Sequence, residues 1–219
     1  MSRLFRDTIS GEVIPLEVWA LYERFYRLSF YRRRHILRVT AVLEGLAKRH
    51  GLDEHLSRWA GFGHDLAREC SRPHLLAEAK RLGVRVGPVD EEEPLLLHGP
   101  VAAAWLKAAG AGDESVWQAI SLHTTAGPRM TALAKALYIA DGVEPGRHYS
   151  DRQRLWERSL EDLEDGFRAV LESSVHYIRE RGLTLHPDTR LALDEVIGAS
   201  RDQVEGYAGQ QHGFDNHVS

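Results

Sequence analysis

The chain has very little cysteine and no long apolar run. Its 219 residues include one cysteine, Cys70, which can form neither an internal disulfide nor a zinc ribbon. No stretch reaches the roughly 20 apolar residues that a membrane span needs. The N-terminal MSRLFRDTISGEV carries an acidic residue early and has no hydrophobic block, so we expect a cytoplasmic protein that binds no membrane. A net charge of −4 gives no general attraction to nucleic acid, and we expect no nucleic-acid partner.

The apolar pattern is helical almost throughout. A chain of this length with 43% apolar and 27% charged residues suits one globular domain with a real core. Apolar residues recur at helical rather than strand spacing. We predict helices at about 15–29, 35–50, 53–69, 73–82, 100–110, 113–124, 128–141, 151–181 and 187–208. Val84–Val89 alone has strand character and is too short to found a sheet, so the predicted fold is an all-α bundle.

Several helix boundaries carry recognisable signals. Asp53 and Asp113 stand at predicted N-cap positions. Four prolines fall at predicted first-turn positions: Pro73, Pro100, Pro128 and Pro187. Three glycines are expected to end helices: Gly51, Gly110 and Gly182.

Among the twelve histidines, a subset shares apolar helix faces with two aspartates. The inward-facing set is His35, His64, Asp65, His98, His123 and Asp141. A single inward histidine is more often a hydrogen-bonded core residue than a ligand. However, buried carboxylates without partners cost several kcal/mol, and few basic residues lie on these faces to pair with them. Imidazoles and carboxylates suit divalent first-row metals, and two metals can share one bridging carboxylate, so the pattern predicts a metal cluster.

Small residues precede the adjacent His-Asp pair. We expect Ala60, Gly61 and Gly63 to leave room beside His64 for ions and a substrate.

The ordered set of His35, GHDLAR with His64 and Asp65, and Asp141 resembles the HD superfamily of metal-dependent phosphohydrolases. Further segments resemble its YqeK branch, the symmetrical hydrolases of diadenosine tetraphosphate: LLLHGPVAAAWL, LHTTAGPRMTALAKALYIAD, VEPGR and HYIRERGLTLHPDT. The resemblance runs from Arg32 to about residue 195. Two positions depart from the family pattern, with Arg68 in place of a common lysine and AGFG in place of an aliphatic run before the pair.

The resemblance implies an HD-domain helical bundle with a two-metal site between core helices. Residues 1–30 would then be an N-terminal helical extension, 31–199 the phosphohydrolase domain, and 200–219 a helix end and flexible tail. The aromatic first helix is expected to cover the core or to pair with a second subunit, so a homodimer stays open. The implied metal is iron, and manganese and cobalt suit similar ligands. The implied ligands are His35, His64 and Asp141 for one ion and His98 and His123 for the other, with Asp65 bridging.

The activity that the resemblance implies is symmetrical hydrolysis of diadenosine tetraphosphate to two ADP by a metal-activated water. The residues expected to act in catalysis are Asp65, His64, Lys135 and Arg68. Those expected to contact the dinucleoside polyphosphate are Lys135, Arg147, Arg129, Thr124, Thr125 and Arg32. Lys135 is the foremost of these candidates because it precedes Asp141 on the same predicted helix and matches a family lysine.

Two alternatives stay open on the sequence. The same site could hydrolyse a mononucleotide, a cyclic nucleotide or an alarmone, or the fold could serve a non-catalytic nucleotide-binding regulator. A ferritin-like di-iron bundle is disfavoured because no glutamate stands three residues before any histidine. We expect neither a P-loop nor a dinucleotide-binding site, because the sequence has no G-x-x-x-x-G-K motif and GFGHDL does not complete G-x-G-x-x-G.

Overall fold

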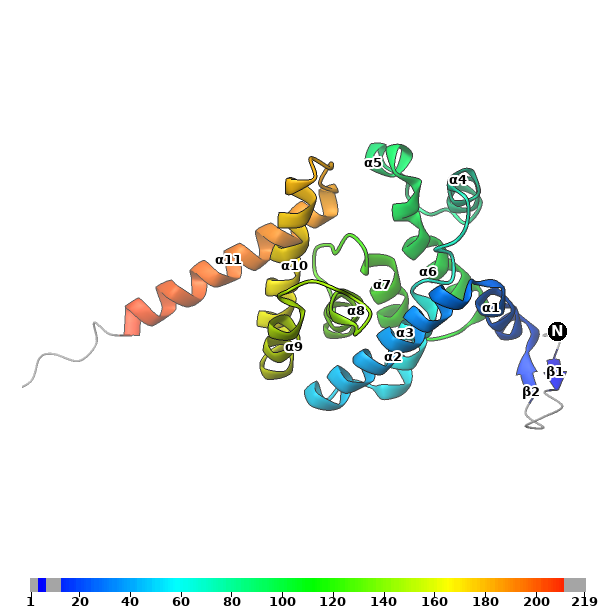
Figure 1. The fold of residues 1–219 in the computed structure, drawn as a ribbon, viewed down its shortest axis with the longest axis horizontal. Helices are drawn as coiled ribbons and strands as arrows, with labels where there is room; N and C mark the ends of the chain where they lie inside the picture. Colours follow the sequence, from blue (N-terminus) through cyan, green and yellow to red (C-terminus); the bar gives the residue numbers. More distant parts are fainter. Residues whose placement is uncertain (1–3, 7–12, 211–219) are drawn as a thin grey trace, which may run out of the picture.

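The structure, a computed structural model, describes residues 4–6 and 13–210, with side chains described for residues 16–198. The predicted all-α class is confirmed (Figure 1). The helices are α1 Leu16–Arg27, α2 Phe30–His50, α3 Glu54–Gly63, α4 Arg72–Arg81, α5 Pro88–Glu92, the 3-10 helix η1 Pro94–Leu97, α6 His98–Ala109, α7 Glu114–Leu122, α8 Ala132–Val143, α9 Arg152–Glu161, α10 Leu163–Glu180 and α11 Pro187–Gln210. Within this part of the chain, we find no helix with the length and apolar character needed to cross a bilayer.

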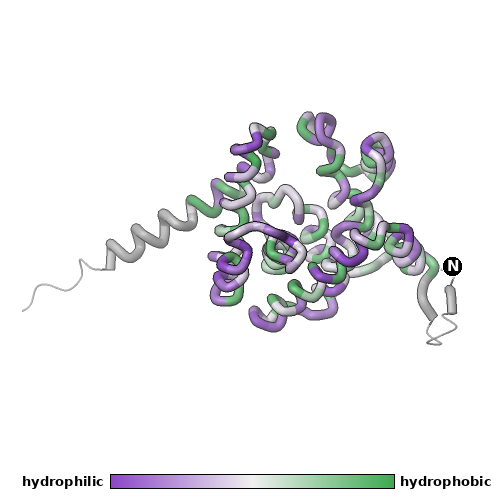
Figure 2. Tube along the Cα trace, viewed as in Figure 1, coloured by the Kyte–Doolittle hydropathy of each residue, from purple (hydrophilic) through white to green (hydrophobic). Residues whose placement is uncertain are grey.

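Helix α8 lies at the centre of the bundle. It packs against α2, α3, α7, α9 and α10, and most of its residues are buried. Its buried side chains are Leu133, Ala134, Ala136, Leu137, Tyr138, Ile139, Ala140 and Val143. In most of the other helices, hydrophobic and hydrophilic residues alternate along the chain, as expected for helices with one buried face (Figure 2). The carboxyl end of α8, where Asp141 lies, is therefore held from several sides.

The first and last described elements, the strands before α1 and helix α11, extend from this bundle in opposite directions (Figure 1). A hairpin that the sequence analysis missed precedes α1, with β1 Leu4–Arg6 antiparallel to β2 Val13–Pro15. Its three-residue strands are too short to show a periodicity. Helix α11 projects from the other side and continues to Gln210, slightly beyond the predicted end. Of the helix end and tail predicted at 200–219, residues 211–219 lie outside the described residues.

Most of the predicted helix boundaries are confirmed. The carboxylate of Asp53 accepts from Leu56 N at 2.8 Å, and that of Asp113 accepts from Ser115 N at 3.0 Å. Gly51 and Gly110 end their helices in the left-handed conformation, with φ of 67° at each. Pro187 begins α11 and Pro73 lies in the first turn of α4.

Two predicted helix starts are wrong. The helix predicted at 35–50 begins five residues earlier, at Phe30, because Ser29 caps α2 by accepting from Arg32 N at 3.1 Å. Pro128 was expected in the first turn of a helix at 128–141, but α8 begins only at Ala132. The preceding chain includes Ala126 and Arg129 with φ of 55° and 53°, which no right-handed helix accommodates. Thr131 then caps α8 by accepting from Ala134 N at 3.2 Å.

Two other helix predictions and the one segment with strand character need correction. The predicted helix at 151–181 is two helices, because Asp162 has an extended backbone and caps α10 by accepting from Asp165 N. The segment Val84–Val89, given strand character above, is a loop that leads into α5. The predicted helix at 53–69 ends at Gly63, and a run of tight turns follows it.

The small residues before His64 serve helix packing rather than space for ions. A Cβ at Gly61 would lie 2.9 Å from Thr40 Cα, so glycine lets α3 approach α2 closely. A Cβ at Gly63 would lie 2.7 Å from Ile120 Cδ1, within the packing of α3 against α7. Their effect on the site is to set the position of His64.

Candidate metal centre

The six inward-facing residues predicted from the sequence converge in the structure. Five of them lie at or near helix ends, where the chain changes direction. His64 and Asp65 follow the last turn of α3, His98 opens α6, His123 follows α7, and Asp141 lies in the last turn of α8. His35 differs, since it lies in the second turn of α2. The four histidines and Asp65 are buried, and Asp141 keeps about a fifth of its side chain exposed.

The adjacent pair can face one centre because the backbone tightens after α3. His64 N still bonds to Ala60 O as in an α-helix, whereas Leu66 N bonds to Gly63 O and Arg68 N to Asp65 O, three residues back. This change from α-helical to tighter turns brings consecutive side chains toward the same side.

Three of the imidazoles are oriented by backbone carbonyls three residues earlier. The Nδ1 of His64 lies 2.7 Å from Gly61 O, and that of His123 lies 2.7 Å from Ile120 O. His98 Nδ1 lies 2.5 Å from Leu95 O. A carbonyl only accepts, so each Nδ1 carries the proton and each neutral ring presents an unprotonated Nε2. This is the tautomer of histidines that bind metals through Nε2.

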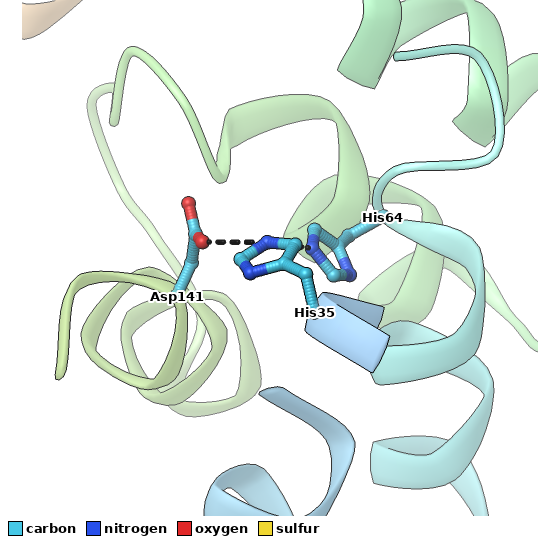
Figure 3. Close-up of side chains that lie close together, drawn as sticks. All are labelled: His35, His64 and Asp141. Atoms are coloured by element: carbon cyan, nitrogen blue, oxygen red, sulfur yellow. Dashed lines mark hydrogen bonds and ion pairs between the residues drawn. The ribbon is translucent and has the colours of Figure 1, made fainter. Parts of the chain in front are cut away.

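The Nε2 atoms meet one another and the two carboxylates. His64 Nε2 lies 3.3 Å from His35 Nε2, which in turn lies 3.1 Å from Asp141 Oδ1 (Figure 3). On the other side, the Nε2 atoms of His98 and His123 lie 3.0 Å apart.

Asp65 stands between these two groups. Its Oδ2 lies 3.4 Å from His35 Nε2 and 3.7 Å from His64 Nε2. Its Oδ1 lies 3.1 Å from His98 Nε2 and 3.8 Å from His123 Nε2. One carboxylate therefore directs one oxygen at each pair of imidazoles.

This donor set fits divalent metal ions. Two unprotonated nitrogens at 3.0 Å, as in His98 and His123, repel each other unless a cation or proton lies between their lone pairs. Two overlapping groups have ligand atoms within 4.8 Å of one another. The groups are His35, His64 and Asp141, and His64, Asp65 and His123. His98 belongs to neither group by this measure, although it is the imidazole nearest to Asp65 Oδ1.

Both carboxylates and His123 already favour the protonation states that metal binding requires. Although burial works against ionisation, the imidazole of His64 holds the pKa of Asp65 well below its usual range. The pKa of Asp141 is likewise lowered against burial, chiefly by its hydrogen bond with His35. Burial, followed by the neighbouring imidazoles, lowers the pKa of His123 to about 3. The carboxylates are therefore anionic and His123 is neutral at neutral pH.

A buried carboxylate outside the predicted ligand set stands behind His35. Glu144 Oε1 lies 3.2 Å from His35 Nδ1, and Glu144 is only 2% exposed. Arg38 donates to both Glu144 oxygens, and Gly146 N donates to Oε2 at 2.6 Å. Although burial opposes it, these bonds, led by Arg38, lower the pKa of Glu144 to about 2. Glu144 thus orients His35 as the three carbonyls orient the other imidazoles.

Both carboxylates and three of the imidazoles, those of His35, His98 and His123, line a cleft of about 350 Å³. Three arginines line it. Arg32 donates to Asp65 Oδ2 at 2.5 Å, and its Nε is buried without a partner among the described residues. Arg147 donates to Asp141 Oδ1 at 2.6 Å. Arg68 also lines the cleft, so the side chain at the departure from the family lysine reaches the site.

The remaining predicted contact residues divide into two groups. Thr124 lines the cleft, with its hydroxyl 3.1 Å from His123 Nε2. Lys135 instead pairs with Glu164 of α10 at 2.6 Å, and Arg129 is exposed, with its backbone N–H bonded to Glu195. Thr125 lines a second cleft next to the first. The structure does not bring these last three to the metal-site cleft.

Comparison with known proteins places this arrangement in a family. The model of the HD domain matches residues 32–146, more than half of the chain and including all six residues at the centre. A solved structure from Clostridium acetobutylicum, described as a predicted HD superfamily hydrolase involved in NAD metabolism, superposes with a TM-score of 0.78 at 29% identity. It covers 83% of this chain and 97% of its own.

Curated relatives carry a more specific name. Proteins named bis(5'-nucleosyl)-tetraphosphatase, symmetrical, from Halalkalibacterium halodurans and Bacillus subtilis are each 27% identical to this chain. Their alignments cover 78% and 80% of this chain and 91% and 94% of the relatives. A protein of the same name from Staphylococcus aureus is 34% identical over 55% of this chain and 62% of its own length. With its helical fold, its centre of histidines and aspartates and the matching family model, the chain belongs to the HD domain family.

Proposed function

We propose that this protein is a metal-dependent phosphohydrolase that cleaves diadenosine tetraphosphate symmetrically into two molecules of ADP. The observation that carries the proposal is the position of Asp65, with one oxygen facing His35 and His64 and the other facing His98 and His123. This is the arrangement expected of a carboxylate that bridges two cations. The curated relatives named for this activity, which align with most of the chain, support the choice of substrate.

Each proposed ligand set follows from one side of Asp65. His35, His64 and Asp141 would hold one cation, and His98 and His123 the other. Bound cations supply Lewis acidity for the phosphoryl oxygens and for the attacking water. We propose iron, and the same mixture of imidazole and carboxylate ligands also suits manganese and cobalt.

The arginines that line the cleft supply positive charge that complements an anionic substrate. A tetraphosphate chain is strongly anionic, and phosphoryl transfer proceeds through a loose transition state in which positioning and electrostatics do most of the catalysis. Arg32, Arg68 and Arg147 surround the cleft from three segments of the chain. Each guanidinium has five N–H donors, so Arg32 and Arg147 retain donors for phosphate oxygens beyond their bonds to Asp65 and Asp141.

Thr124 is proposed to bind substrate on the side of His98 and His123. Its hydroxyl lies 3.4 Å from His98 Nε2 and 3.1 Å from His123 Nε2. When these nitrogens hold a cation, the hydroxyl is free to donate to a phosphate oxygen or to the water next to them.

Product analysis tests the proposal directly. The protein is purified anaerobically, its metal content is measured, and diadenosine tetraphosphate is added and the products are separated by chromatography. ADP as the only product supports the proposal. ATP with AMP, or faster release of phosphate from a mononucleotide, would instead assign the centre to another reaction. Binding of the tetraphosphate without turnover by the metal-loaded protein would favour a regulator.

A further inference from the structure

A second cleft of about 210 Å³ adjoins the metal-site cleft. It lies between the loop and helix at 84–90, the end of α7, and the first turn of α11. Leu96 of η1 lines both clefts, while Thr124 lines the first and its neighbour Thr125 the second. The two clefts are therefore separated by Leu96 and by the segment Thr124–Thr125.

The walls of the second cleft are largely apolar. Its apolar lining is Val84, Pro88, Val89, Leu96, Leu97, Pro100 and Leu122. Its polar groups include Asp90 and His186, which come from segments far apart in the sequence, in α5 and just before α11. The other polar side chains in its lining are Arg85, Ser121, Thr125 and Asp188. A flat apolar slot with a few directed polar groups is typical of sites for small ring systems.

Asp90 and His186 both keep hydrogen-bonding capacity toward the cleft. Asp90 Oδ2 accepts from Gly87 N at 2.8 Å, which leaves Oδ1 as an acceptor. His186 Nδ1 accepts from Asp188 N at 3.1 Å, so the proton of the neutral ring lies on Nε2. Asp90 Oδ1 and His186 Nε2 are 3.6 Å apart, beyond hydrogen-bonding distance, although their side chains are only 13% and 15% exposed.

The rest of the LHPDT segment accounts for this placement. Pro187 begins α11, and Thr189 donates to Thr125 O at 2.6 Å, which ties the helix to the chain that follows His123. The sequence analysis gave His186 no role beyond resemblance. In the structure, the backbone bonds around it leave its Nε2–H as the donor at the cleft.

We propose that this second cleft binds an adenine of the substrate, with Asp90 accepting from the exocyclic amine and His186 donating to a ring nitrogen. Adenine presents such a donor and acceptor side by side on one edge, and its faces suit apolar walls. The proposal rests on the proposed function. A nucleotide with its phosphates among Arg32, Arg68 and Arg147 would reach this site past Leu96, which lines both clefts.

The test compares two ligands that share the diphosphate group. Calorimetry with the metal-loaded protein measures the dissociation constants of ADP and of inorganic pyrophosphate, which has no base. We expect His186→Ala to weaken ADP binding about tenfold, the effect of one lost hydrogen bond in a buried site, and to leave pyrophosphate binding unchanged. His176→Ala is the matched control, since His176 also faces a carboxylate, Glu180 at 3.1 Å, but lines neither cleft.

A second variant and an activity measurement separate the outcomes. Val89→Trp fills the cleft and is expected to weaken ADP binding by at least the same factor, again without an effect on pyrophosphate. In hydrolysis of diadenosine tetraphosphate, both variants should raise KM more than they change kcat. Unchanged ADP affinity in the folded His186→Ala and Val89→Trp proteins would overturn the adenine site. Absence of hydrolysis by the wild type would overturn the proposed function instead, because the comparison of ADP with pyrophosphate does not require turnover.

Discussion

We expect Gly99→Ala to disturb the metal centre by crowding His123, one of its proposed ligands. Gly99 follows His98 in α6, and a Cβ placed on it would lie 2.7 Å from Ile120 O and 3.1 Å from His123 Nδ1. Those two atoms form the hydrogen bond that orients His123. A methyl group there must therefore displace both the carbonyl and the ring, whereas the native glycine leaves them in contact.

The size of the effect follows from the cost of overpacking. Inserting a methyl group into a tightly packed site costs about 1–3 kcal/mol. For a chain of this length the corresponding fall in melting temperature is about 2–12 °C. Gly45→Ala is the control, because its Cβ would meet Trp156 Cη2 at an ordinary 3.6 Å in the interior of α2. We expect this control to stabilise the protein by about 0.5–1 kcal/mol through helix propensity.

The assay has two parts. Urea unfolding in a chelator gives the free energy of unfolding without metal, and elemental analysis of loaded protein gives the metal content. Gly99→Ala is expected to lose stability and to hold less metal than wild type, while Gly45→Ala loses neither. A Gly99→Ala protein with wild-type stability and full metal content would show that the close contact with His123 is not real.

Further predictions concern the ligands and the pH response. Asp65→Asn should reduce turnover below about 1% and remove most of the metal, measured by product chromatography and elemental analysis, whereas His74→Ala should change neither. His98→Ala should leave about one metal per chain instead of two, and unchanged stoichiometry would reject the second ion. A chelator should lower the melting temperature of loaded protein by about 5–10 °C for each cation present at a hundred times its dissociation constant, and an unshifted melting curve would contradict binding to the folded state. The pKa of the Glu78 carboxyl is lowered to about 2, and the main cause is its side-chain hydrogen bonding with Arg81. Because the folded-state pKa is depressed, this stabilisation is fully present above the unfolded value of about 4.3 and is lost as the pH falls toward 2. The difference in urea midpoint between wild type and Glu78→Gln should therefore shrink from pH 5 to pH 2.5, and a constant difference would be inconsistent with ionic stabilisation.

The sequence was informative about the residues at the site because helical periodicity identifies buried faces. His35 and His123 share helix faces with apolar residues, which predicted that they are buried. Asp53 and Asp113 cap helices because their carboxylates accept from free backbone N–H groups in the first turn. The convergence of separate helices on one centre is a tertiary property. The inward-facing histidines and aspartates predicted a metal cluster, and the resemblance to a family supplied the ligand set. The assignment of ligands to particular ions remains a proposal.

The features that the sequence analysis missed depend on contacts between distant segments or on single backbone angles. Glu144, three residues after Asp141, was expected from the sequence to orient Arg147 or the metal shell, but its contacts with His35 and Arg38 join segments more than a hundred residues apart. The break at Asp162 reflects one extended residue within a continuous helical pattern. The small size of Gly61 led us to expect open space beside His64. In the structure Thr40 occupies that space, so the glycine allows close packing of α3 on α2.

Phosphate contacts were harder to predict than ligands because long basic side chains can turn to several partners. Lys135 lies on the same helix as Asp141 but pairs with Glu164. Its assignment to phosphate stays a prediction, and it requires this ion pair to open.

The central claim is that Asp65 bridges two cations, and anomalous diffraction from crystals loaded with Mn²⁺ tests it most directly. The account predicts two peaks about 3.5–4 Å apart, one between His35, His64 and Asp141 and one next to His98 and His123, with an Asp65 oxygen toward each. A single peak, or peaks away from these imidazoles, would contradict it.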